Sequence, residues 1–143
     1  MSNVAANVVP ALNVLGTPLQ ACSLPDGPTT GWRRDGFCRT DHTDYGQHCV
    51  CCELTLDFLD YTKTQGNDLS TPRGKFPGLK PGDRWCLCSS RWLEAHRVGK
   101  APKVILESTH ERATAIIPIE LLEANSASEG QAQAGLEGLK SDL

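Results

Sequence analysis

Hydrophobic and polar positions along the chain outline several short elements separated by long polar stretches. The segment His48–Glu53 is short and rich in residues that pack on a pleated surface, which predicts a strand. Thr55 can then cap a helix whose hydrophobic positions share one side and which ends at Gly66. Further along, Trp85–Cys88 predicts another strand, and a serine directly after it can cap a helix that runs to about Val98.

The remaining hydrophobic positions predict two further elements. Lys103–Ser108 contains a continuous hydrophobic run of strand length, and Ala113–Ile117 can be its antiparallel partner. Thr109 can instead cap a short helix through Ala115, and the sequence leaves both possibilities open. Pro118–Ala124 predicts a closing helix. A few-stranded, largely antiparallel sheet with two to three helices packed on one side is an α+β fold.

Two long segments between these elements are dense in turn-forming residues. Residues 16–43 and 67–83 collect Gly, Pro, Asp and Asn, so we predict long ordered loops, which in compact domains often carry function. The composition of the two ends predicts flexible tails at residues 1–12 and 125–143. Residues 13–124 are therefore predicted to form a single domain.

The charge balance argues against several classes of partner. The chain has a net charge of -3 and a pI near 5.8, so it offers no basic field to hold a nucleic acid. No hydrophobic run approaches the roughly 20 residues that cross a bilayer, and the first fifteen residues lack the pattern of a secretion signal. We expect a soluble, cytoplasmic protein that binds neither nucleic acid nor membrane.

Seven cysteines among 143 residues are the most distinctive feature of the composition. Their number is odd and no secretion signal accompanies them, so reduced thiols are expected. Cys51 and Cys52 are adjacent, which places their Cα atoms about 3.8 Å apart, below the usual disulfide range. Any disulfide would therefore have to join distant segments.

Five cysteines lie in the two predicted strands: Cys49, Cys51, Cys52, Cys86 and Cys88. If the strands are neighbours, sulfur atoms of both can converge on one face, and four thiolates would suit zinc. The two-residue spacing of zinc knuckles is absent, however, and buried cysteines often act as small hydrophobic side chains. Packing is therefore the stronger interpretation of these residues taken alone.

Cys88 is the best candidate for a reactive thiol. It lies just before a predicted helix start, where backbone N–H groups and Arg91 would favour the thiolate. A nucleophile also needs a base, and the sequence does not show which histidine approaches Cys88 among His42, His48, His96 and His110. Cys38, in the first loop, is a second candidate, with neighbouring charges of both signs.

Several motifs resemble those of DUF2237, an uncharacterised family of bacterial and plant proteins. The likeness covers roughly residues 13–124, and it is most specific in GNDLSTP at 66–72 and FPGLKPGDRWCLC at 76–88. It includes NVLGTPL at 13–19 and DGFCRT at 35–40. The resemblance implies a small two-layer α/β sandwich and cytosolic residence, and it implies no particular activity.

The resemblance also implies which thiols matter. The family pattern has cysteines at the positions of Cys22, Cys38, Cys51, Cys86 and Cys88 and a histidine at His48, whereas Cys49 and Cys52 depart from it. The catalytic candidates are accordingly Cys88, Cys38 and His48. The candidate metal ligands, with zinc as the expected ion, are Cys38, Cys51, Cys86 and Cys88.

Two hypotheses of function follow from these observations. In the first, thiols meet beside a loop-lined pocket for a small molecule and serve metal binding or thiol chemistry. In the second, the loops 16–43 and 67–83 form a groove of a non-catalytic module that binds a small ligand or a protein, and the cysteines only pack. The sequence does not decide whether the protein is an enzyme.

Overall fold

The computed structural model describes residues 11–127, so residues 1–10 and 128–143 of the predicted tails lie outside the described residues. The elements, in chain order, are β1 (His48–Glu53), α2 (Leu56–Thr64), β2 (Arg84–Cys88), α3 (Ser89–His96), β3 (Lys103–Val104), the 3-10 helices η1 (Leu106–Ser108) and η2 (Glu111–Ala115), and α4 (Ile119–Ala124). The described strands form an antiparallel sheet in the order β2-β1-β3. This combination confirms the predicted α+β class. No helix in the described part of the chain is long and apolar enough to span a membrane.

The main hydrophobic core lies between the sheet and the helices. Phe58 of α2, Trp92 of α3 and Leu122 of α4 are fully buried in one cluster with Val50 of β1. The buried indole N–H of Trp92 donates a hydrogen bond to the backbone oxygen of Pro102 at 3.0 Å. Each such side chain contributes about 1.5–3 kcal/mol by leaving water, so this core fixes the sheet against the helices.

The first predicted helix begins as expected, whereas the start of α3 differs. The hydroxyl of Thr55 caps α2 by accepting from the backbone N–H of Phe58 at 3.1 Å. At α3, Cys88 occupies the N-cap position without a side-chain cap bond, and Ser89 is the first helical residue. The Ser89 hydroxyl donates to the backbone oxygen of Gln47 at 3.1 Å. It therefore attaches α3 to the start of β1 and does not cap the helix.

The predicted hairpin between residues 103–108 and 113–117 is wrong. β3 has only two residues, and the chain continues into η1 and η2. The side chain of Thr109 explains the difference, because its hydroxyl accepts from the backbone N–H of Cys51 at 3.1 Å, a donor that a longer strand would otherwise use. The alternative helix is closer to the structure, although His110 caps η2 in place of Thr109.

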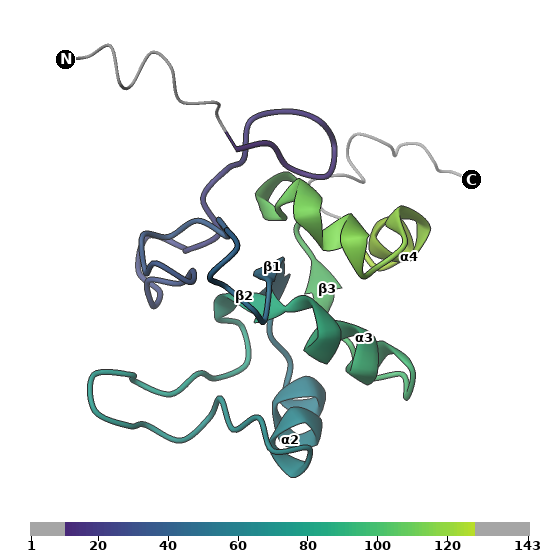
Figure 1. Cartoon of the computed structure of the whole chain (residues 1–143). Helices are drawn as coiled ribbons and strands as arrows, with labels where there is room; N and C mark the ends of the chain where they lie inside the picture. Colours follow the sequence, from purple (N-terminus) through teal and green to yellow (C-terminus); the bar gives the residue numbers. More distant parts are fainter. Residues whose placement is uncertain (1–10, 128–143) are drawn as a thin grey trace, which may run out of the picture.

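The first long loop is attached to the sheet by two disulfides. This loop lies on the side of the sheet away from α3 and α4 (Figure 1). Cys22 is bonded to Cys51 of β1, and Cys38 is bonded to Cys86 of β2, with sequence separations of 29 and 48. The expectation of reduced thiols is therefore wrong for these four cysteines. The expectation that a disulfide must join distant segments is confirmed.

The physical reason is the register of the two strands. Cys51 and Cys86 are directly paired across β1 and β2, so two sulfur atoms meet on the face that the loop covers. The loop then supplies one cysteine to each of them. A linear reading of the chain contains no spacing that would reveal this arrangement.

Removing one crosslink should lower the free energy of unfolding by about 3 kcal/mol, because closing a loop of this length restricts the unfolded chain. The double variant Cys22→Ser with Cys51→Ser tests this by urea denaturation, without reductant and with a chelator present. Cys88→Ser, which alters a thiol outside both disulfides, is the control and should change the free energy by less than about 0.5 kcal/mol. If the double variant unfolds at the same urea concentration and with the same slope as the wild-type protein and Cys88→Ser, the prediction is wrong.

Candidate functional site

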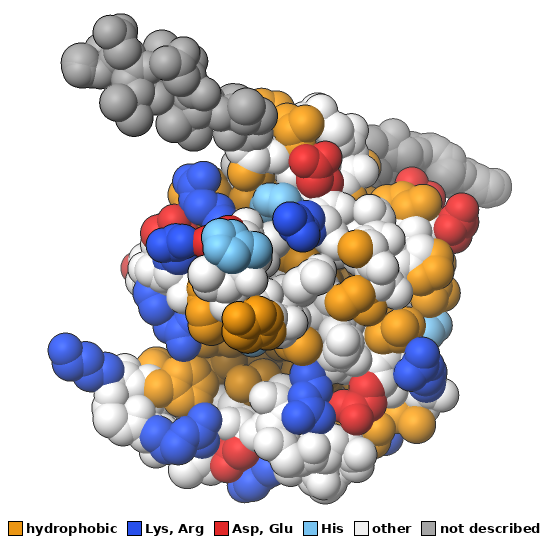
Figure 2. Space-filling view, viewed as in Figure 1, with side chains coloured by type: hydrophobic (Ala, Val, Ile, Leu, Met, Phe, Trp, Pro, Cys, Tyr) orange, Lys and Arg blue, Asp and Glu red, His pale blue; other side chains and the backbone are white. Residues whose placement is uncertain are grey.

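A pocket of about 520 Å³ opens where the two long loops meet the sheet. Trp32 and Arg34 of the first loop, Arg73 and Phe76 of the second loop, and Trp85 of β2 contribute to its walls. In the space-filling view, a hollow with hydrophobic walls lies between the upper body of the molecule and the lower loop (Figure 2). Its volume is in the range of small-molecule sites.

Cys88 and His48 face each other at one end of the β1–β2 ladder. They are register partners, and both line the pocket. The register shifts between His48 and Val50, so Cys49 forms a bulge in β1. Bulges re-aim neighbouring side chains and are common beside active sites. Cys88 is free and partly exposed, so its thiol is open to a molecule in the pocket.

The imidazole of His48 is oriented by a buried carboxylate. Its Nδ1 lies 2.6 Å from Oδ1 of Asp44, whose side chain is fully buried. The other carboxylate oxygen accepts from the backbone N–H of His48 at 2.9 Å and from the hydroxyl of Thr40 at 3.0 Å. A carboxylate only accepts, so this contact assigns the proton to Nδ1 and leaves Nε2 as the acceptor of the neutral ring.

Packing against Trp32 and Gly46 also holds the imidazole ring of His48 in place. Trp32 stacks on His48 with a centroid separation of 5.5 Å and an interplanar angle of 7°. Gly46 lies so close that a Cβ there would be 2.6 Å from Cε1 of the ring. A glycine is therefore needed at this position for the ring to keep its place.

The backbone oxygen of Gln47 holds the start of α3, which follows Cys88. It accepts from the backbone N–H groups of Cys49 and Ser89, at 2.8 and 3.1 Å, and from the hydroxyl of Ser89 at 3.1 Å. Gln47 adopts a φ of 48°, an unusual conformation for a residue with a side chain. These bonds fix the first residue of α3 to the start of β1, and they thereby fix Cys88 opposite His48.

The other two free thiols among the described residues are buried. The thiol of Cys49 donates to the backbone oxygen of Gln47 at 3.3 Å, and burial raises its pKa to about 11. Burial also raises the pKa of Cys52 well above its ordinary value. Neither thiol is suited to react near neutral pH, since the thiolate is the nucleophile.

The structure answers which histidine approaches Cys88. His42 is exposed, His96 stacks on Trp92 with centroids 5.3 Å apart, and Nδ1 of His110 accepts from a backbone N–H in η2. Of the four histidines, all within the described residues, His48 is the one that lines the pocket.

Arg91, which the sequence places near Cys88, binds two other groups. Its Nη1 donates to the backbone oxygen of Gln65 at 3.1 Å and to the carboxylate of Glu94 at 3.2 Å. The first of these bonds connects α3 to the end of α2, since Gln65 is the C-cap residue of that helix. The first-turn N–H groups of this helix remain as the source of positive potential near the thiol.

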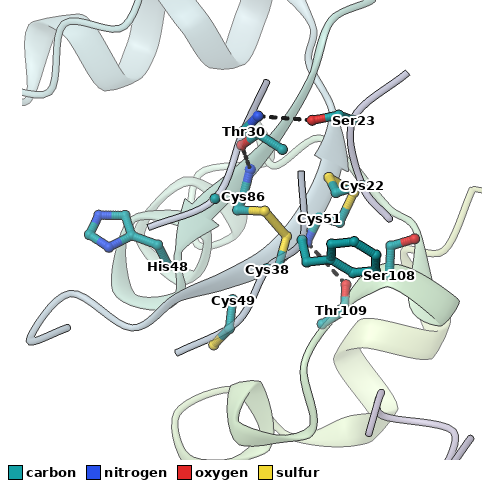
Figure 3. Close-up of a disulfide and its surroundings, with 12 residues drawn as sticks. Cys22, Ser23, Thr30, Cys38, His48, Cys49, Cys51, Cys86, Ser108 and Thr109 are labelled. Carbon is teal, nitrogen blue, oxygen red and sulfur yellow. Dashed lines mark hydrogen bonds between the residues drawn. A yellow bond between two sulfur atoms is a disulfide. The ribbon is translucent and has the colours of Figure 1, made fainter. Parts of the chain in front are cut away.

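The predicted metal ligands are brought together in part. Cys38, Cys51 and Cys86 gather with Cys22 in a buried cluster away from His48 (Figure 3). Cys88 lies outside this cluster and lines the pocket, whereas Cys86 belongs to the cluster and also contributes to the pocket lining. Cys38, the second catalytic candidate, is fully buried and bonded to Cys86.

The pocket walls combine positive charge with aromatic rings. The guanidinium of Arg34 lies 4.9 Å from the ring centroid of Trp85, and that of Arg73 lies 5.3 Å from Phe76. Arg73 also lies 3.9 Å from a carboxylate oxygen of Asp68, whereas Arg34 forms no ion pair with any described residue. No Asp or Glu among the described residues lines the pocket.

Sequence reasoning missed Gly46 as part of this site, and it gave Asp44 no role in orienting His48. Aspartates and glycines in a loop are normally explained by turns, and nothing linear distinguishes Asp44 from its neighbours. The four-residue spacing between Asp44 and His48 is the one available signal, and it becomes informative only when the loop conformation is known.

The chain also matches a known protein family. A family described as "Uncharacterized protein conserved in bacteria (DUF2237)" matches residues 12–126, which is most of the chain. No curated protein matches the chain.

Alkylation should distinguish the three free thiols. Native protein treated with iodoacetamide near pH 7 should be modified at Cys88, while Cys49 and Cys52 should react only after unfolding, because burial suppresses their thiolates. Peptide mass spectrometry identifies the modified positions. Labelling of Cys49 or Cys52 at the rate of Cys88 in the folded protein would refute the assignment.

Gly46→Ala should displace the ring of His48, because the added methyl group would overlap Cε1. The expected result is a large change in the imidazole signals of His48 in nuclear magnetic resonance spectra, with the fold retained. Gly27→Ala is the matched control, since its Cβ would make an ordinary 3.5 Å contact with Leu24. Unchanged His48 signals in Gly46→Ala would show that the ring is not confined as described.

Proposed function

Because this chain belongs to the DUF2237 family, whose description names no activity, we propose a function from the pocket itself: nucleophilic thiol chemistry on a small anionic substrate. In this proposal Cys88 is the nucleophile, His48 is the general base and Asp44 orients the base. The observation that carries it is the buried Asp44 carboxylate on Nδ1 of His48, with Cys88 as the register partner of that histidine.

The three residues divide the roles of a nucleophilic site. A nucleophile needs an adjacent base, and the base needs a third group that fixes its tautomer and orientation. Asp44 supplies that third group from within the fold, where its carboxylate also accepts two further hydrogen bonds. The Nε2 atom of His48 is then available to take the proton of a thiol.

Acyl transfer is the reaction class that fits these groups. The Cys88 thiol gives its proton to Nε2 of His48, and the sulfur attacks the carbonyl carbon of the substrate. As the carbon–leaving-group bond breaks, the leaving group takes that proton, and a thioester with Cys88 remains. Water or another acceptor then displaces the sulfur. The backbone N–H groups of Ser90 and Arg91, in the first turn of α3, can stabilise the negative oxygen.

The pocket chemistry indicates the class of substrate. Arg34 and Arg73 place two cations in walls that hold no acidic residue among those described, which favours an anionic group such as a carboxylate. Trp32, Phe76 and Trp85 offer flat hydrophobic surface for the remainder of the molecule. A small carboxylate with a flat hydrophobic part fits both features.

The alkylation rate of Cys88 tests the proposed base. We expect His48→Ala and Asp44→Asn to lower the rate with iodoacetamide near pH 7 by about tenfold or more, in keeping with the size of general-base effects. His42→Ala, which alters an exposed histidine, should leave the rate unchanged. If Cys88 reacts no faster than free cysteine and His48→Ala has no effect, the non-catalytic binding module becomes the better interpretation.

A comparison of two reagents tests the proposed substrate charge. Iodoacetate is anionic and iodoacetamide is neutral, so their rate ratio at Cys88 reports the electrostatic potential in the pocket. Arg34→Gln should lower the ratio about fivefold, the effect of roughly 1 kcal/mol between charges in water. Arg33→Gln is the control, because Arg33 pairs with Asp41 and does not line the pocket. An unchanged ratio in Arg34→Gln would contradict the anionic substrate.

A further inference from the structure

A second group of sulfur atoms lies outside the pocket chemistry. The Sγ atoms of Cys22, Cys38 and Cys51 all lie within 4.8 Å of one another, and Cys86 is bonded to Cys38. The four cysteines are buried in one small cluster with Ile105. They come from the first loop, β1 and β2, so a single compact site joins three segments of the chain.

We propose that, when both disulfides are reduced, these four cysteines bind one Zn²⁺ ion as thiolates. A tetrahedral zinc site has Zn–S distances of about 2.3 Å, which places its sulfur atoms about 3.8 Å apart. The Sγ atoms of Cys22, Cys38 and Cys51 lie within 4.8 Å of one another and so already occupy a space of this size, and Cys86 is bonded to one of them. The proposed set includes Cys22 and excludes Cys88, in contrast to the set expected from the sequence.

The surroundings favour an ion over four uncompensated thiolates. The relative exposure of the four cysteines is 0–2%, and a buried negative charge without a partner is costly. A divalent cation removes that cost and releases the thiol protons to solvent. Burial among hydrophobic side chains also excludes water, so the site would be closed, as structural zinc sites are.

The backbone of the two strand cysteines is held independently of their sulfur atoms. The N–H of Cys86 donates to the hydroxyl of Thr30 at 2.8 Å, and the N–H of Cys51 donates to the hydroxyl of Thr109 at 3.1 Å (Figure 3). The N–H of Thr30 in turn donates to Ser23 at 2.8 Å. None of these bonds involves sulfur, so opening the disulfides does not itself break them, and they can return the ligands to the same positions once an ion is bound.

Reduction also provides a path for the ion to enter. The loop carries Cys22 and Cys38, and its covalent links to β1 and β2 are the two disulfides. Once these are broken, hydrogen bonds such as that from the N–H of Gln20 to the backbone oxygen of Glu107, at 3.0 Å, hold the loop. Such local contacts open far more readily than a covalent crosslink.

The disulfide and zinc states are mutually exclusive, because the same sulfur atoms form both. Two molecules of a disulfide oxidant such as oxidised glutathione accept four electrons from the four thiolates. Two protein disulfides form, the oxidant leaves as four thiolates, and Zn²⁺ is released. A cytoplasmic location, which remains a prediction, would favour the reduced, zinc-bound state.

Cobalt binding to the full chain tests the proposal. The protein is reduced, freed of metal by a chelator, and titrated anaerobically with Co²⁺, whose visible absorption reports tetrahedral thiolate ligation. We expect one ion per chain in reduced protein, displacement by Zn²⁺, and no binding after oxidation to the two disulfides. If reduced wild-type protein shows no saturable absorption of tetrahedral Co²⁺–thiolate ligation, the proposal is overturned by this experiment alone.

Two variants distinguish this site from the pocket. Cys22→Ser should lose stoichiometric binding, whereas Cys88→Ser should keep it together with the same spectrum. The opposite result would overturn the proposed ligand set. Because Cys22→Ser can fail to fold, circular dichroism accompanies the titration, and the wild-type and Cys88→Ser spectra decide the question in that case. Cys88→Ser removes the proposed nucleophile, so the two proposals fail independently.

Discussion

The attachment of the first loop to β1 and β2 is the constraint on which the rest of the structure depends. The loop has no regular secondary structure of its own, and two sulfur–sulfur bonds fasten it to paired positions of the sheet. That attachment brings Trp32 and Arg34 to one wall of the pocket. It also brings the loop around Asp44 beside β1, where its carboxylate orients His48. Without this link, the sheet and helices would still have a core, but the pocket would lose one side.

Much of the regular structure could be predicted because local signals determine it. The Thr55 cap and the composition of β1 act within a few residues, and both elements have the expected bounds or nearly so. The hairpin after β3 failed for a different reason. The hydroxyl of Thr109 takes the backbone donor of Cys51, from a residue 58 positions away, and no local pattern reports such a competition.

For the candidate site, too, local sequence signals identified residues, while distant parts of the chain determine how these residues are arranged. Cys88 could be found because it precedes a helix, and His48 because a family pattern placed a histidine there. Their pairing depends on the register of β1 and β2, and on the bulge at Cys49 that shifts it. The orientation of His48 depends on Gly46 and Trp32, which reach it through the loop conformation. Each of these steps is tertiary, so the residues were predictable and their arrangement was not.

Cys86 and Cys88 show how one short segment serves two sites. In a continuing strand, residues two apart point to the same face, and the sequence therefore suggested a shared role. The chain leaves the strand at Cys88, which has the N-cap position of α3. Both residues line the pocket, but the sulfur of Cys86 is bonded to Cys38 in the buried cluster, while Cys88 is free and partly exposed. The end of a strand thus separates a crosslinked, buried sulfur from a partly exposed thiol, and a change in the oxidation state of the cluster need not consume the thiol proposed to react.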